Sequence, residues 1–383
     1  MACVGIICEY NPFHLGHASQ FAQIRQRLGA DTTIVCLMSG SYVQRGEPAI
    51  FDRMARAKAA LLSGANLVLE MPVNASLSSA EGFAQRGVAL LSPICGYLCF
   101  GMESGDVSGL LSTAQALLSP EFSQKLRQTL QTGISFPAAR AQALVEMGLQ
   151  NSPVEKPNDI LAVEYTKALL QQNSPMKMLP IRRPGDYHAQ GPDKENPSAT
   201  ALRILLTEGK SIQPYTTREA FSLFQDAPVH TLLSGEKALL YRLRTMTDGE
   251  FEALPYGSEG LWRRLMHACR EEGSLEEILE AVKTKRYTRT RLNRMVLCAY
   301  LGIDATMLAS PAPYCRILGF DDLGREALGK NKKEGLYRPL GRQENSAYSA
   351  LEKRANMLYG LFCRDGMESP TQAERQRVFR VTE

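Results

Sequence analysis

Two histidines with a glycine beside them stand near the start of the chain, in the run Asn11-Pro12-Phe13-His14-Leu15-Gly16-His17. The run follows an apolar segment typical of a buried strand and precedes a helical pattern. A helix N-terminus carries free backbone N–H groups and the positive end of the helix dipole, so it binds anions. Imidazoles there can donate hydrogen bonds to phosphate oxygens, and Gly16 lets a nucleotide approach the backbone. This context predicts a nucleoside triphosphate site with His14 and His17 as catalytic residues, although two ordinary cap histidines would share the spacing.

A second segment that could bind phosphate is Ser198-Ala199-Thr200-Ala201-Leu202-Arg203. Ser198 and Thr200 at a helix start can cap N–H groups or hold a phosphate, and Arg203 can reach the same anion. Alone, the segment is equally well explained by a plain helix cap with a solvated arginine. A competing P-loop at Gly209-Lys210-Ser211 is excluded, because Ile204 stands where its first glycine must be.

The composition is that of an ordinary globular protein, with 44% hydrophobic and 22% charged residues. At 383 residues two domains are expected. No apolar run approaches the roughly 20 residues that cross a bilayer, and no signal-peptide pattern precedes the first strand. The nine cysteines include no C-x-x-C pair, so neither a zinc ribbon nor a disulfide framework is indicated. We therefore expect a cytoplasmic protein without a membrane partner.

Short apolar runs alternate with helical patterns from Met1 to about Leu206, which predicts an α/β fold with a parallel sheet covered on both faces. Ligands of such sheets bind beyond the carboxyl ends of the strands. His14, Ser39-Gly40, Glu70 and Gly101 all fall at such ends, so a single site is expected there. The expected strands are residues 3–8, 33–38, 67–69, 97–100 and 178–181.

The pattern changes near residue 211, where we place the boundary between an ATP-binding domain at 1–210 and a mainly helical region at 211–383. Basic residues form two clusters in that region, and the first is expected on one helical stretch around Tyr287. Basic side chains interleaved with aromatic ones suit a nucleic-acid surface, while a solvated face is the plainer explanation. The clusters are Lys283, Lys285, Arg286, Arg289, Arg291 and Arg294, and Lys330, Lys332, Lys333, Arg338 and Arg342.

Further segments complete a recognisable pattern. They are Glu9 to His17, Met38-Ser39-Gly40-Ser41-Tyr42-Val43-Gln44-Arg45-Gly46-Glu47-Pro48-Ala49, Phe100-Gly101-Met102-Glu103, Lys156-Pro157-Asn158-Asp159-Ile160-Leu161, Tyr187-His188 and Tyr287-Thr288-Arg289-Thr290-Arg291-Leu292. The H-x-G-H and the serine-threonine-arginine segment resemble the ATP-binding signatures of the nucleotidyltransferase superfamily. All the segments together resemble the bacterial tRNA(Met) cytidine acetate ligase family, with the string at 38–49 as the most specific part.

The resemblance implies a Rossmann-like parallel sheet of the HxGH nucleotidyltransferase type, followed by a mainly helical C-terminal domain. It implies an enzyme that uses ATP and acetate to acetylate the N4 amine of the wobble cytidine of elongator tRNA(Met). Lys285, Arg286, Arg289 and Arg291 are the expected tRNA contacts. The expected ATP-binding residues are Ile7, Cys8, Glu9, Tyr10, Asn11, Pro12, Phe13, His14, Leu15, Gly16, His17, Ala18, Ser19, Gln20, Gly101, Asn158, Arg182, Arg183, Ser198, Thr200 and Arg203.

Two positions depart from the family's pattern. Pro197 precedes Ser198 where an aliphatic residue is expected. Ala189 follows Tyr187-His188 where an acidic residue is common, which puts any role for an acid there in doubt. Counting back from Tyr187 favours Arg182 over Arg183 as the arginine that faces ATP.

The implied chemistry needs no protein nucleophile. Attack of acetate on the α-phosphate of ATP expels pyrophosphate and gives an acetyl-adenylate, so the protein has to position the reactants and neutralise charge. His14, His17, Arg182 and Arg203 suit this task, and Mg²⁺ is expected between the phosphates. The cytosine amine then attacks the acetyl carbon, so the base must leave any stack.

Two other functions fit part of the pattern. An adenylyltransferase acting on a small phosphorylated metabolite would share the H-x-G-H but would not explain the basic carboxyl-terminal half. An RNA-binding protein with a regulatory nucleotide pocket would explain the basic clusters and would not turn ATP over. Acetate-dependent pyrophosphate release separates both from the ligase.

Overall fold

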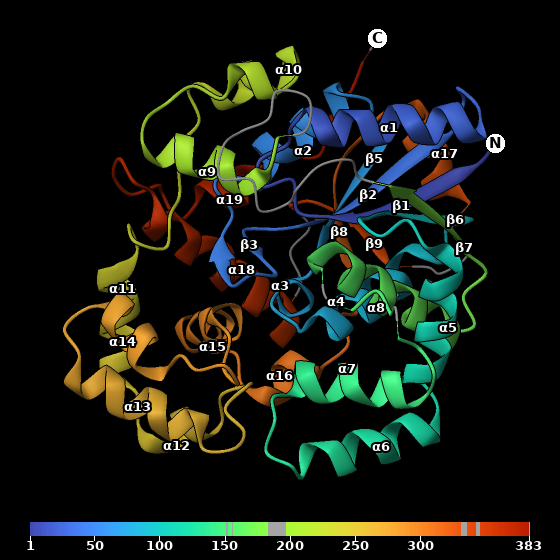
Figure 1. The fold of residues 1–383 in the computed structure, drawn as a ribbon. Coiled ribbons are helices and arrows are strands. Elements are labelled where there is room, and N and C mark those ends of the chain that lie inside the picture. Colours follow the sequence, from blue (N-terminus) through green and yellow to red (C-terminus); the bar gives the residue numbers. More distant parts are fainter. Residues whose placement is uncertain (151, 155, 183–196, 331–334, 342–344, 383) are drawn as a thin grey trace.

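A single sheet forms the centre of the molecule (Figure 1). The computed structural model describes residues 1–150, 152–154, 156–182, 197–330, 335–341 and 345–382. The strand order is β10-β8-β5-β2-β1-β6-β7, with β9 also paired to β8. Four neighbouring pairs of strands are parallel, namely β5–β2, β2–β1, β1–β6 and β6–β7. Strand β8 is antiparallel to β5. The strands are β1 (Cys3–Cys8), β2 (Thr33–Ser39), β5 (Leu67–Met71), β6 (Tyr97–Met102), β7 (Lys177–Arg182), β8 (Cys315–Phe320), β9 (Tyr337–Pro339) and β10 (Phe379–Arg380).

The predicted parallel sheet is confirmed, and its apolar strands account for it. β2 and β5 are buried along their whole length, as strands covered on both faces must be. Side chains alternate between the two faces, so Val4 and Ile6 lie in one apolar cluster and Ile7 lies in another. Each strand expected before residue 206 is present within two residues of its predicted ends.

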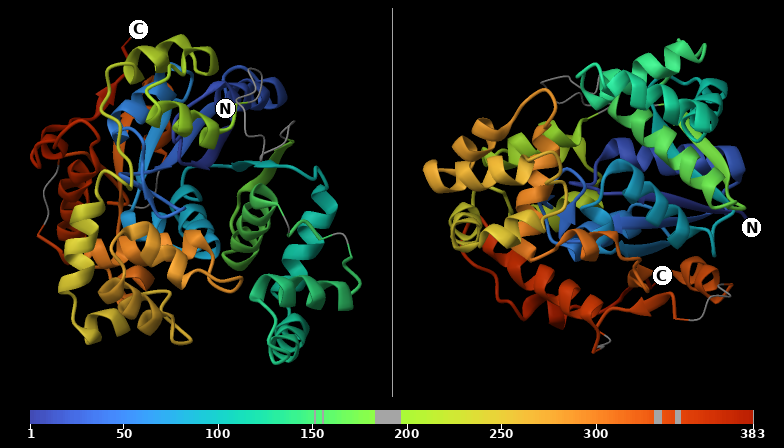
Figure 2. Two further views of the ribbon diagram at one scale, coloured as in Figure 1. Left: turned by 60° about the vertical axis from the view of Figure 1, so that its left-hand side comes forward. Right: turned by 90° about the horizontal axis from the view of Figure 1, so that it is seen from below.

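Helices cover both faces of the sheet. The cluster around Val4 includes residues of α1 and α2, and the cluster around Ile7 includes residues of α4 and α8. Helices α5 to α7 stand apart from the sheet, as Figure 2 shows. The elements are α1 (Leu15–Leu28), β3 (Tyr42–Val43), β4 (Glu47–Pro48), α2 (Arg53–Leu62), α3 (Val73–Ser76), α4 (Ala80–Leu91), α5 (Val107–Leu117), α6 (Pro120–Leu130), α7 (Phe136–Glu146), α8 (Pro157–Gln171) and α9 (Ala199–Thr207).

The next part of the chain is helical and has its own apolar cluster, which also includes Tyr42 and Val73 from the sheet-bearing part. We call α11 to α15 the helical lobe; it lies at the lower left of Figure 1. The elements are η1 (Gln213–Tyr215), α10 (Arg218–Phe224), α11 (Glu236–Thr245), α12 (Asp248–Glu252), α13 (Leu261–Glu271), α14 (Leu275–Val282), α15 (Arg289–Leu301) and α16 (Ala305–Ala309).

The last part of the chain returns to the sheet, which the sequence pattern did not predict. It supplies β8, β9 and β10, and the helices α17 (Asp322–Gly329), α18 (Ala347–Tyr359), η2 (Gly360–Phe362) and α19 (Gln372–Arg375). Strands β9 and β10 have three and two residues and form by pairing with β8, so they carry no periodic signal of their own. The sheet contains strands from both sides of residue 210. The boundary at residue 210 therefore stays a proposal about which part of the chain binds ATP and which binds tRNA. Among the described helices, none has the length and apolar character that a membrane crossing requires.

Candidate nucleotide-binding and transfer site

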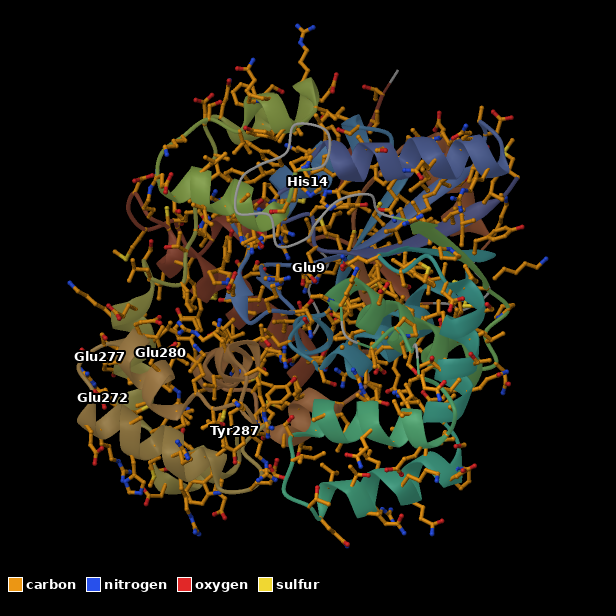
Figure 3. All side chains as sticks on the ribbon, viewed as in Figure 1. Glu9, His14, Glu272, Glu277, Glu280 and Tyr287 are labelled. Atoms are coloured by element: carbon orange, nitrogen blue, oxygen red, sulfur yellow. The ribbon has the colours of Figure 1, made fainter. Side chains whose placement is uncertain are left out.

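The candidate site lies where the strand order of the sheet reverses. The chain runs from β1 outward to β2 and β5, then crosses to β6 on the other side of β1 and on to β7. Doubly wound sheets bind ligands at such a point, in the crevice beyond the carboxyl ends of the two diverging strands. β1 and β6 are in register as far as Ile6 and Cys99, and the H-x-G-H residues and Gly101 follow. Figure 3 shows Glu9 and His14 near the centre of the molecule.

His14 and His17 are fixed by the backbone at the start of α1. His14 is the N-cap, and its Nδ1 accepts a hydrogen bond from the Gly16 N–H at 3.1 Å. Nδ1 of His17 accepts from the His14 N–H at 3.2 Å, which completes a capping box. Because each Nδ1 is an acceptor, the neutral ring carries its proton on Nε2. Both histidines are therefore held as Nε2–H donors at the positive end of a helix, which is the arrangement that binds phosphate.

Aromatic side chains hold the two imidazoles in place. The His14 and His17 rings are stacked with their centroids 3.8 Å apart. The ring of Tyr10 lies edge-on to His17 at 4.7 Å, and the ring of Phe13 lies 5.5 Å from it. Tyr10 and Phe13 are buried, so within the predicted ATP-binding stretch they support the histidines from the core side.

The rest of that stretch divides between three elements. Ile7 and Cys8 end β1, and Glu9 to Phe13 form the turn. The side chain of Gln20 is buried and donates to the Cys99 sulfur at 3.4 Å, so it ties α1 to β6. The first turns of α1 supply Leu15, Gly16, His17, Ala18, Ser19 and Gln20.

The second motif meets the first, although nearly two hundred residues separate them. Ser198 caps α9 by accepting from the Ala201 N–H at 3.1 Å. Arg203 donates to the carbonyl oxygen of Asn11 at 2.9 Å and lies 3.3 Å from the Thr200 hydroxyl. The expectation that the two motifs share one site therefore agrees with the packing of the guanidinium onto the H-x-G-H turn.

The third group of predicted residues lies at the ends of β6 and β7. Glu103 accepts from the Asn158 side-chain amide at 2.8 Å, which joins the loop after Gly101 to the start of α8. Asp159 accepts the backbone N–H of Glu103 at 2.7 Å. Arg182 stands opposite Met102 in the β6–β7 register, so Gly101, Asn158 and Arg182 come together. Arg183 lies outside the described residues, and so does the Tyr187-His188 segment.

Arg56 is a residue at this edge of the sheet that sequence reasoning missed. Its side chain is fully buried, and it donates to the carbonyl oxygens of Glu9 at 2.6 Å, Ser39 at 3.0 Å and Phe51 at 2.9 Å, and also to that of Gly40. Burial lowers the pKa of this guanidinium below its usual value. An arginine in a helical pattern indicates a solvent-exposed face, so no signal in the sequence marks this position.

The predicted tRNA contacts lie in the helical lobe, away from the histidines. Arg286 pairs with Glu259 at 2.6 Å, and Arg289 pairs with Glu276 at 2.5 Å. Arg291 donates to the Tyr256 carbonyl oxygen at 2.7 Å.

Lys285 is exposed, and no ion pair is found for it among the described residues. The expectation that the basic residues around Tyr287 lie on one helical stretch is wrong. Residues 283–288 form the connection before α15, and Thr288 caps that helix. In the second cluster, Lys332, Lys333 and Arg342 lie outside the described residues.

Within the described part of the chain, no group of three or more His, Cys, Asp or Glu side chains is arranged to hold a metal ion. Mg²⁺ at phosphate sites is usually held by phosphate oxygens and water with one or two carboxylates. Glu103, which follows the end of β6, is a carboxylate that such an ion could use.

Known proteins resemble this chain along most of its length. A family model described as HIGH Nucleotidyl Transferase matches residues 1–374. The chain is 35% identical over 370 residues to the tRNA(Met) cytidine acetate ligase of Acetivibrio thermocellus, covering 87% of this chain and 86% of that protein. It is 33% identical over 402 residues to the protein of the same name in Bacillus subtilis, covering 98% and 94%.

Solved structures agree with this relationship. A crystal structure of Thermotoga maritima TmcAL without ligand superimposes with a TM-score of 0.90 at 30% identity, covering 100% of both chains. A second crystal form of that protein, bound with alpha-thio ATP, gives a TM-score of 0.88. The family and relatives agree with the resemblance inferred from the motifs. The chain thus belongs to the HIGH nucleotidyl transferase family, together with the tRNA(Met) cytidine acetate ligases.

Proposed function

We propose that this protein is an ATP-dependent tRNA(Met) cytidine acetate ligase, which activates acetate as acetyl-adenylate and transfers the acetyl group to the wobble cytidine of elongator tRNA(Met). The observation that carries the proposal is the similarity to proteins of that name along 87% to 98% of the chain. The related Thermotoga structure with an ATP analogue supports ATP as the nucleotide. With ATP and tRNA as substrates, the cytoplasm is the compartment that fits.

The first step is attack of an acetate oxygen on the α-phosphorus of ATP. A phosphorus–oxygen bond forms to acetate, and the bond to pyrophosphate breaks. The Nε2–H groups of His14 and His17 and the start of α1 stabilise the negative charge on the phosphates. Arg203 and Arg182 add positive charge from α9 and β7, and Ser198, Thr200, Gly101 and Asn158 complete the proposed nucleotide site. Mg²⁺, if held here with the help of Glu103, would supply further charge neutralisation.

The second step needs the anticodon loop of the tRNA at the same site. We propose that the helical lobe binds the tRNA backbone through Lys285, Arg286, Arg289 and Arg291. The ion pair of Arg286 is exposed, and that of Arg289 is half-buried. Such pairs contribute about 0.2–1 kcal/mol each, so their exchange for phosphate contacts costs little.

The direct test is incubation of the purified protein with labelled acetate, ATP and total tRNA, followed by nucleoside analysis. N4-acetylcytidine in tRNA(Met) is expected, with pyrophosphate release that depends on acetate. Acetyl-coenzyme A in place of ATP and acetate should give no product. Full activity with acetyl-coenzyme A alone would assign the protein to the acetyltransferases, and ATP turnover without acetate would favour an adenylyltransferase.

A further inference from the structure

The transfer step produces a proton that the site must accept. When the N4 amine of cytosine attacks the acetyl carbon, the amine nitrogen loses a proton while the bond from that carbon to the AMP oxygen breaks. AMP leaves as an anion and needs no proton, so the site needs a base rather than an acid. A positioned base contributes typically 10²–10⁴-fold to such a step. Because this base would act in the second of the two proposed steps, its assignment rests on the proposed function.

The two histidines are unsuited to this task. The Nδ1 atoms of His14 and His17 already accept backbone N–H groups, so the ring nitrogens that remain are proton donors. The Cys8 thiol at the end of β1 is also unsuited, because burial raises its pKa well above the usual value. The base is therefore to be sought among the carboxylates at the carboxyl ends of the strands.

Most of these carboxylates are committed to other groups. Glu70 at the end of β5 pairs with Arg53 through both of its oxygens, at 2.8 and 2.9 Å. Asp159 accepts the backbone N–H groups of Glu103 and Ser104. Glu103 lies on the β6 side of the site, where it accepts from Asn158, one of the predicted nucleotide contacts.

Glu9 differs from these carboxylates in its contacts and in its place. It is half-buried at the end of β1, and its Oε1 accepts from the Gln44 N–H at 2.6 Å. Among the described residues, no hydrogen-bond partner is found for Oε2. The carbonyl oxygen of Gln44 in turn accepts from Arg294 of α15 at 3.1 Å. Glu9 therefore stands between the phosphate-binding turn and the helical lobe, on the side from which the tRNA is proposed to approach.

We propose that Glu9 is the general base of acetyl transfer. Its Oε2 takes the proton from the N4 amine as the carbon–nitrogen bond forms and the carbon–oxygen bond to AMP breaks. Oε1 keeps its hydrogen bond to the Gln44 N–H and so holds the carboxylate in one orientation. The products are N4-acetylcytidine, AMP and the protonated carboxyl group of Glu9, which returns its proton to water.

The surroundings of Glu9 favour this role. Burial raises the pKa of its carboxyl group above the usual value, although the hydrogen bond from Gln44 and the charges of Arg45 and Arg203 oppose the change. A carboxylate with a raised pKa is a stronger base at neutral pH. The charged and titratable groups around it are Arg45, Glu47, Arg56, Tyr165 and Arg203.

The test compares the two steps in Glu9→Gln and in a matched carboxylate variant, Glu103→Gln. The glutamine at position 9 keeps an oxygen that can accept from the Gln44 N–H, but it cannot take a proton. We expect single-turnover transfer from preformed acetyl-adenylate to tRNA to fall at least ~10²-fold more than acetate-dependent pyrophosphate release. Transfer by the wild-type enzyme should rise with pH as the Glu9 carboxyl group ionises, and this rise should be absent in Glu9→Gln. Glu103→Gln should lower both steps alike and keep the rise.

Several results would overturn the assignment. Equal loss of both steps in Glu9→Gln would show that the carboxylate acts in nucleotide or metal binding. A selective loss of transfer in Glu103→Gln would move the base to that residue. Glu9→Asp guards against misfolding, because it keeps a carboxylate and should retain the pH dependence at a reduced rate. If the wild-type enzyme forms no acetyl-adenylate, the proposed function itself fails, and that result is independent of the variants.

Discussion

At the scale of single residues, His14 and His17 show how the backbone decides what a side chain can do. Each Nδ1 is occupied by a backbone N–H at the start of α1, which assigns the proton of each ring to Nε2. The same hydrogen bonds cap the helix, so each histidine has a structural role and a chemical one. These roles can be separated by substitution, because asparagine is a good N-cap and has no imidazole.

We expect His14→Ala to lower the free energy of unfolding by about 1 kcal/mol because the helix cap is removed, and to reduce acetate-dependent pyrophosphate release by ~10²-fold or more. His14→Asn should recover most of the stability, since its side-chain oxygen can accept the Gly16 N–H, and little of the activity. Urea unfolding and pyrophosphate release measure the two effects. Wild-type rates in His14→Asn would show that the residue is only a cap.

At the scale of elements, the loop between β3 and β4 joins the nucleotide site to the helical lobe. Its Gln44 N–H donates to Glu9, and its Gly46 packs on the backbone of α15. Gly46 has a φ of +79°, and a Cβ there would lie against the Arg294 nitrogen and 2.6 Å from the carbonyl carbon of Asn293. The most specific string of the sequence, residues 38–49, thus contains this connecting loop.

Gly133 is a matched control for this close packing, because its φ is +84° and nothing lies within 4 Å of the place of its Cβ. Gly133→Ala should cost about 1–2 kcal/mol of stability, since only the unfavourable φ is added. Gly46→Ala should cost about 1–3 kcal/mol more, because the loop must move away from α15. It should also slow transfer to tRNA more than adenylate formation. Equal costs in urea unfolding for the two variants would show that the loop does not depend on its close approach to α15.

At the scale of the whole molecule, tRNA binding and adenylate formation are assigned to different parts of one chain. Figure 1 shows the helical lobe at the lower left, below β3, while helices α5 to α7 lie at the lower right. The predicted tRNA contacts are in that lobe, and the histidines are at the sheet edge. Strand β8 follows the lobe in the chain and pairs with β5, so the chain enters the lobe from the sheet-bearing part and returns to the sheet after it.

Replacing Lys285, Arg286, Arg289 and Arg291 by alanine should weaken tRNA binding and flatten its salt dependence. The slope of log K against log salt should fall by roughly 0.7–0.9 for each phosphate that the variant no longer binds. Lys285→Ala alone should lower this slope by the amount expected for one phosphate contact, since the Lys285 side chain is exposed. Lys177→Ala removes an exposed lysine at the amino end of β7 and serves as the control. Unchanged affinity and slope in the fourfold variant would place the tRNA surface elsewhere.

The sequence by itself determined the parallel sheet, the helix at H-x-G-H and the family. Strands such as Thr33–Ser39 are continuous apolar runs, and helix starts carry capping residues. The order of neighbouring residues is therefore enough to predict these strands and helices. The motifs could be recognised because their chemistry depends on residues that are close in the chain.

Only the tertiary structure decided which distant groups meet. The hydrogen bond between Arg203 and the Asn11 carbonyl oxygen, the burial of Arg56 and the pairing of Arg289 with Glu276 all depend on residues that are not neighbours in the sequence. The strands β9 and β10 likewise form only against β8. Side-chain type and local periodicity say nothing of such partners, because the free energy of these interactions comes from burial and pairing in the folded chain.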